Sequence, residues 1–153
     1  MAFPSSSGTV PLTLEAGWEL ARTVATSIKN TCANINAQIA AGPVSSSQVV
    51  GLAAYFYSQL QVLNQVAAIG GIAAYAQAQI NNASENIATD FSNMTAALQA
   101  TINWIVANFP VDSSGYLQYQ KYDANGNFVY LQFTSAQLSG LQTQLTSLAA
   151  TIN

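Results

Sequence analysis

The side chains that could carry acid–base chemistry are few, because only nine of the 153 residues are charged and the chain contains no histidine. Glu15 and Glu19 are four residues apart and would share a helix face, and Arg22 follows three residues after Glu19. A carboxylate pair that hydrolyses glycosides needs burial to separate its two pKa values. Nothing near these residues predicts such burial, so we expect them to provide favourable electrostatics at the start of a helix.

Glu85 and Asp90 form the second close pair of carboxylates in the sequence. On a continuous helix, five residues correspond to about 140° of rotation, so the two side chains would not face one substrate together. Their predicted role is therefore to keep the surface soluble.

Three further motifs indicate structure rather than chemistry. Cys32 is the only cysteine and falls in an apolar helical stripe, so we expect a small core residue. Segment 123–127 (DANGN) starts like a calcium loop but has no downstream bidentate glutamate, so we interpret it as a turn. Gly70-Gly71 is not followed by lysine, as a phosphate-binding loop would be.

The missing residue types exclude most enzyme classes. Nucleophile pairs of the Ser–His and Cys–His kinds need a histidine, and the carboxylates are too dispersed to form a metal site. The sequence therefore predicts a protein that is not an enzyme, with no catalytic residues, no cofactor-binding site and no metal site.

The charge balance also limits the classes of partner that the protein is expected to bind. The net charge is −3, and the only basic residues are Arg22, Lys29 and Lys121. Three scattered cations do not make the basic patch that nucleic acids or anionic membranes require. Residues 1–7 (MAFPSSS) lack the pattern of a signal peptide, and the longest apolar run, 66–76, is shorter than the 20 or so residues of a membrane span. We expect neither direct nucleic-acid binding nor membrane association.

The elements that must position these residues are mainly helical. Residues 1–12 contain two prolines and three consecutive serines, which predicts an extended N-terminal arm. Thr13 is the expected N-cap of a first helix over 14–41, whose apolar residues alternate in steps of four and three. Gly42-Pro43 should end this helix.

A second helix is expected to begin with the capping box of Ser45 and Gln48. It is apolar on most sides, which predicts a central helix, and no charge occurs between Asn30 and Ser84. Gly70-Gly71 predicts a turn or sharp kink. We therefore expect the second helix and its Gly-Gly break to be the part most deeply enclosed, either by this chain or by its copies.

The third helix should run without interruption over 72–109, a length of about 55 Å. Its apolar stripe has a period close to 3.6 residues when one step is allowed at Ala83/Ser84, and Pro110 ends it.

In residues 116–133, aromatic and β-branched residues flank Asn125-Gly126, which predicts a β-hairpin with those two residues at the turn centre. In that register Tyr122 opposes Val129. A capping box at Thr134 and Gln137 opens a last helix that carries a leucine stripe. The predicted fold is mainly α: an elongated bundle of about four helices, with a β-hairpin inserted before the C-terminal helix, in a single domain over 13–153.

The aromatic residues of the hairpin segment are the candidate interaction site. Such residues either pack on the protein's own helices or bury large areas against another chain. The candidate interface residues are Tyr116, Tyr119, Tyr122, Phe128, Tyr130 and Phe133.

In style the chain resembles small structural proteins of tailed-bacteriophage virions. The resemblance is carried by the Pro/Ser-rich arm (2–12), the long Ala/Gln/Asn helices (14–41 and 46–109) and the aromatic hairpin before a short last helix. Head–tail connector (adaptor) proteins of such phages are often helical bundles with projecting hairpins that assemble as rings beneath the portal. The resemblance implies a homo-oligomer located in the virion, assembled in the host cytoplasm, with portal or tail components as further partners.

Two other classes of function remain open. Charge-poor, amide-rich helices also suit a secreted helical surface or pore-forming protein. A small ligand-binding bundle, with a pocket between helices near Gly70-Gly71, is the other alternative.

Overall fold

The computed structural model describes residues 12–42, 44–80, 84–110, 120–130 and 133–152. The protein is mainly α, with five helices in this described part. The elements are α1 (Leu12–Ala41), α2 (Ser46–Ala67), α3 (Ile72–Ala78), α4 (Ile87–Asn108), β1 (Gln120–Tyr122), β2 (Phe128–Tyr130) and α5 (Ser135–Ile152). The predicted arm, residues 1–12, lies outside the described residues except for Leu12, which already belongs to α1.

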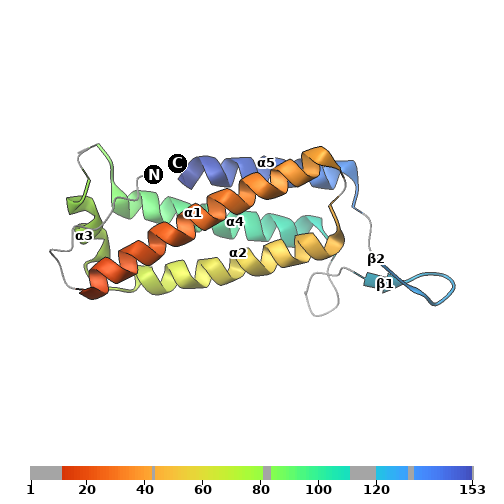
Figure 1. Ribbon diagram of the computed structural model, residues 1–153, viewed down its shortest axis with the longest axis horizontal. Coiled ribbons are helices and arrows are strands. Elements are labelled where there is room, and N and C mark those ends of the chain that lie inside the picture. The colour runs from red at the N-terminus through yellow and green to blue at the C-terminus, as the bar shows by residue number, and fades with distance from the viewer. Residues whose placement is uncertain (1–11, 43, 81–83, 111–119, 131–132, 153) are drawn as a thin grey trace.

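The four long helices form an antiparallel bundle (Figure 1). Helices α1 and α4 each pack against both α2 and α5, so the four helices surround one shared core. The short helix α3 lies at one end of the bundle, against α1 and α4. The two short strands extend beyond the opposite end (Figure 1).

The core combines buried side chains of α2 with the apolar stripes that the sequence predicts on the first, third and last helices. Side chains of these stripes that are no more than 1% exposed include Trp18, Ala21, Ile28, Cys32, Ile87, Met94, Leu98, Ile105, Leu141, Leu145 and Leu148. Steps of three and four residues place them on one face of each helix, where burial removes apolar surface from water.

Two of the three predicted helix starts are confirmed. Ser45 accepts a hydrogen bond from the backbone N–H of Gln48, and the Gln48 side chain accepts one from the backbone N–H of Ser45. Thr134 and Gln137 make the same reciprocal pair, at 2.8 and 3.1 Å. The expectation for Thr13 is wrong, because α1 begins at Leu12, two residues before the expected start, and encloses Thr13 in its first turn. Helix ends commonly differ by a residue or two between competing start signals.

Helix α2 is not the enclosed central helix that its composition predicts. Phe56 is fully buried, but the neighbouring Tyr57 is 56% exposed, and Gly51 and Ala54 lie on the same open side. The reason is topological: in a ring of four helices every helix keeps one face toward solvent. Small and amide side chains, rather than charges, cover that face.

The predicted third helix is in fact two helices, α3 and α4. The Asn86 side chain accepts a hydrogen bond from the backbone N–H of Thr89 and caps α4. Gln77 in α3 accepts from the backbone N–H of Ile87 and donates to the carbonyl of Glu85, both at 2.9 Å. These side-chain bonds satisfy backbone groups that a continuous helix would have paired internally, so the break is stable.

The turn predicted at Gly70-Gly71 is confirmed. Gly71 precedes α3 with φ of +83°, a left-handed conformation that residues with a Cβ rarely adopt. This turn folds α3 back against the start of α1 instead of letting α2 continue.

Candidate functional site

The turn of the hairpin is held together by Asp123. Its backbone N–H donates to the carbonyl of Asn127 at 2.8 Å, and its own carbonyl accepts from the backbone N–H of Gly126 at 3.1 Å. Its carboxylate Oδ1 also accepts from the backbone N–H groups of Asn125 and Asn127, both at 2.9 Å. Asp123 therefore serves as a turn residue, as interpreted from the sequence.

The register of the strands differs from the prediction by one residue. Tyr122 pairs with Phe128, not with Val129, and Lys121 pairs with Val129. A two-residue turn centred on Asn125-Gly126 needs positive φ at both residues, yet among the described residues only glycines have it, and Gly126 has φ of +80°. The chain instead uses a three-residue loop, residues 124–126, which the hydrogen bond between the Asp123 N–H and the Asn127 carbonyl closes. Gly126 is the left-handed residue of this loop.

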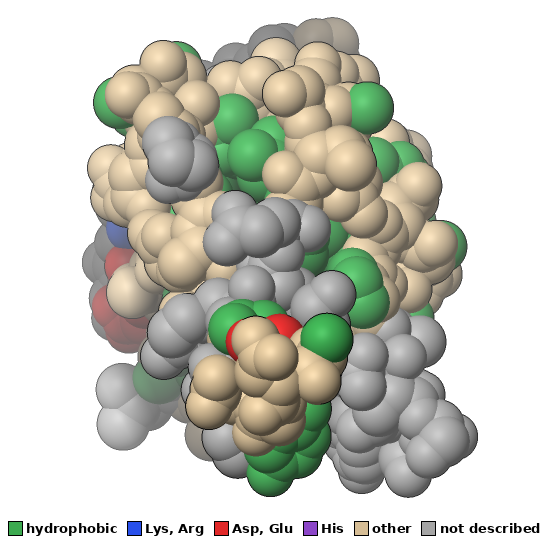
Figure 2. All heavy atoms as spheres, turned by 90° about the vertical axis from the view of Figure 1, so that its right-hand side faces the viewer, with side chains coloured by type: hydrophobic (Ala, Val, Ile, Leu, Met, Phe, Trp, Pro, Cys, Tyr) green, Lys and Arg blue, Asp and Glu red, His purple; other side chains and the backbone are tan. Residues whose placement is uncertain are grey.

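The hairpin stands clear of the helices (Figure 1). Tyr122 is 64% exposed, and β1 and β2 pack mainly against each other. Figure 2 looks onto this end of the molecule and shows hydrophobic and uncharged polar groups over most of the described surface, with acidic groups near the protruding part. This end is the candidate functional site.

The other predicted interface residues are placed as follows. Phe128 and Tyr130 belong to β2, whereas Tyr116 and Tyr119 lie outside the described residues. Phe133 packs on the bundle itself: its ring lies edge-on to that of Phe109, with 4.6 Å between the centroids. Among the candidate residues whose side chains the structure describes, Tyr122 is therefore exposed and Phe133 is not part of the exposed site.

Glu85 and Asp90 meet in the structure, contrary to the expectation that they point apart. Glu85 precedes the first residue of α4, Ile87, so the angular spacing of a helix does not apply to it. A hydrogen bond with the Asp90 carboxyl group, together with desolvation and charge repulsion, raises the pKa of Glu85 from its ordinary value of 4.5. Sequence reasoning missed this pair because it assumed one continuous helix; the polar run 81–86 was the signal of a break.

We expect the Glu85→Gln substitution to flatten the pH dependence of stability. A raised pKa means that the folded state holds the proton more tightly, so this stabilisation is complete below pH 4.5 or so and is lost as pH rises through the folded-state pKa. Thermal unfolding followed by circular dichroism from about pH 4 to pH 7 measures the slope. Asp90→Asn should flatten it as well, and unchanged slopes in both variants would contradict the coupling.

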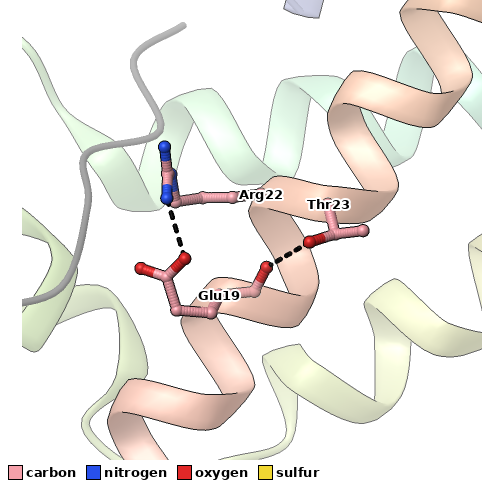
Figure 3. Close-up of polar contacts among 3 residues, drawn as sticks. All are labelled: Glu19, Arg22 and Thr23. Carbon is pink, nitrogen blue, oxygen red and sulfur yellow. Dashed lines mark hydrogen bonds and ion pairs between the residues drawn. The ribbon is translucent and has the colours of Figure 1, made fainter.

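The predicted helix-start electrostatics are found only in part: Glu15 lies in the first turn of α1, whereas Glu19 and Arg22 lie further along the helix. Arg22 Nη1 lies 2.8 Å from Glu19 Oε2, and Thr23 donates its hydroxyl hydrogen to the carbonyl of Glu19 (Figure 3). Both charged side chains are partly exposed, at 32% and 40%, so this ion pair adds little stability.

Cys32 is a core residue, as predicted. It is completely buried in the bundle, and burial raises the pKa of its thiol to about 12. The thiolate that would act as a nucleophile is thus absent at neutral pH.

In the part of the chain that the structure describes, no three histidine, cysteine, aspartate or glutamate side chains come close enough to hold a metal ion. Likewise, none of the described helices is long and apolar enough to span a membrane.

Comparisons of the chain with protein-family models, with curated proteins and with solved structures yield no significant match.

Proposed function

We propose that this protein is a non-enzymatic structural component of a virus particle, which assembles through its hairpin with copies of itself. The head–tail connector (adaptor) is the particle component that its style resembles most. The observation that carries the proposal is the aromatic hairpin that extends beyond the end of the bundle, with Tyr122 64% exposed.

The hairpin is too small to be stable by itself, so contacts with other groups must support it. Each strand has three residues, and an isolated two-stranded hairpin is marginally stable in water. The outer edges of β1 and β2 present backbone groups that a strand from another chain can pair with. An aromatic side chain such as Tyr122 buries roughly 150–250 Å² when it is covered. Contact with a second chain would satisfy both needs.

The charge distribution supports the same proposal. Net charge keeps protein molecules apart, and here only 6% of the residues are charged. The exposed faces of the bundle carry mostly amide, hydroxyl and small side chains, which allow close packing of identical subunits with little electrostatic repulsion.

The test of assembly compares two exposed tyrosines. We expect Tyr122→Ala to weaken self-association by about 30-fold or more, as truncation of a central interface residue does. Tyr57→Ala is the matched control, because Tyr57 is 56% exposed but lies on the side of α2. Size-exclusion chromatography with light scattering, together with negative-stain imaging for rings or filaments, measures the effect.

The outcomes separate assembly from folding. Both variants should keep the thermal unfolding temperature of the wild-type monomer, since neither side chain is in the core. A wild-type protein that stays monomeric at high concentration would overturn the proposal, and so would a Tyr122→Ala variant that assembles normally. If the protein has a role in the virion, we expect neighbouring genes to encode a portal or tail protein. Their absence would contradict the role in the virion but not the self-assembly.

A further inference from the structure

We propose that the end of the bundle beside Gly70-Gly71 contains a binding site for a small, uncharged, bicyclic aromatic molecule. The site is a cavity of about 290 Å³ between α1, α2, α3 and α4. It lies at the α3 end of the bundle, whereas the hairpin extends from the other end (Figure 1), so the two proposals are independent.

The interior of the cavity is formed by large apolar side chains that the bundle already holds in place. Trp18, Ile72, Ile87 and Phe91 line it and are each no more than 9% exposed. The ring centroids of Trp18 and Phe91 are 6.1 Å apart and the ring planes are tilted by 41°, and both rings line the cavity, so an aromatic guest can contact two aromatic side chains. Rigid walls lower the ordering cost of binding.

The space itself comes from the turn and from small side chains. Gly71 has φ of +83° and precedes α3, which packs against α1 and α4 as well as against α2. Ala73 lines the cavity, and Ala67 and Ala88 lie at its solvent-exposed rim, where larger side chains would narrow it. The opening is consequently a result of the packing of four helices and not of a single loop.

The lining selects the chemical class of the ligand. No described residue that lines the cavity is charged, and a charged guest would lose its hydration without gaining an ion pair. Ser92 and Thr95 also line it, and their hydroxyl groups can accept a single hydrogen bond from a guest N–H. A cavity of about 150 Å³ holds benzene, so the larger volume here suits a two-ring molecule such as indole.

The experiment uses the full-length protein and indole itself. Isothermal titration calorimetry measures the affinity, and ¹H–¹⁵N NMR shift changes locate the site. We expect shifts at Trp18, Phe91 and their neighbours. Ala88→Leu places a larger side chain at the rim of the cavity and should weaken binding by at least about tenfold.

Ala100→Leu is the matched control, because it makes the same exchange at an exposed alanine of α4 outside the cavity. It should bind indole like the wild type. Circular dichroism checks that both variants are folded. Absence of binding at millimolar indole, shifts confined to another part of the molecule, or unchanged affinity of Ala88→Leu would each overturn the proposal.

Discussion

Truncation of Phe56 to alanine is expected to lower the free energy of unfolding by about 3–5 kcal/mol. Phe56 is 0% exposed in the middle of α2, where its ring lies between the other helices and 5.8 Å from the ring of Tyr55. Its removal leaves a cavity that a close-packed core refills only in part. Because small domains are stable by only about 5–15 kcal/mol, the loss is a large share of the total.

The measurement is urea unfolding of the two proteins, with thermal unfolding as a second probe; a drop of roughly 10 °C is expected. Tyr57→Ala, one residue further along, is the control because its ring is 56% exposed. That substitution should change stability by less than about 0.5 kcal/mol. Equal effects at the two positions would mean that α2 is packed differently from the structure described above.

Exchange of Gly140 for alanine should destabilise the protein by about 1–3 kcal/mol, although alanine is the better helix former. A Cβ atom at Gly140 would lie 2.5 Å from Trp104 Cζ2 and 2.9 Å from Cη2, closer than carbon atoms can approach. The indole of Trp104 thus packs directly on the backbone of α5, and either this ring or the two helices must shift to admit a methyl group.

Gly51→Ala should have the opposite sign. Gly51 is also inside a helix, but a Cβ atom there meets nothing within 4 Å. The substitution restricts the unfolded chain without a clash and should stabilise by about 0.5–1 kcal/mol. Chemical denaturation of both variants decides the matter, and a stabilising Gly140→Ala would show that the contact of Trp104 with α5 is absent in solution.

Much of the helical architecture could be predicted from local sequence patterns. The three- and four-residue steps of apolar side chains predicted which face of α1, α4 and α5 is buried, because a helix repeats every 3.6 residues whatever its surroundings. The capping boxes at Ser45 and Thr134 also follow from local geometry, since their hydrogen bonds join residues only three apart.

The same local patterns were insufficient where distant segments compete for one residue. Helix α2 carries apolar residues on most of its sides, so the sequence alone did not distinguish Phe56 from Tyr57. The ring of four helices buries Phe56 and exposes Tyr57. The break before α4 depends on Gln77, which reaches Glu85 and Ile87 across the turn. Because a continuous helix was assumed from the sequence, the contact between Glu85 and Asp90 was not predicted.

The sequence by itself determined a mainly helical, charge-poor protein without the residues of most enzymes, because composition and periodicity are properties of the chain. Only the tertiary structure decided which aromatic side chains are exposed, where the helices stop and where a cavity remains. These features depend on contacts between residues far apart in the chain, and a local pattern holds no information about such contacts. For the hairpin, the sequence predicted aromatic residues around a turn; the structure leaves Tyr122 of β1 exposed beyond the end of the bundle and packs Phe133 against Phe109 of the bundle itself.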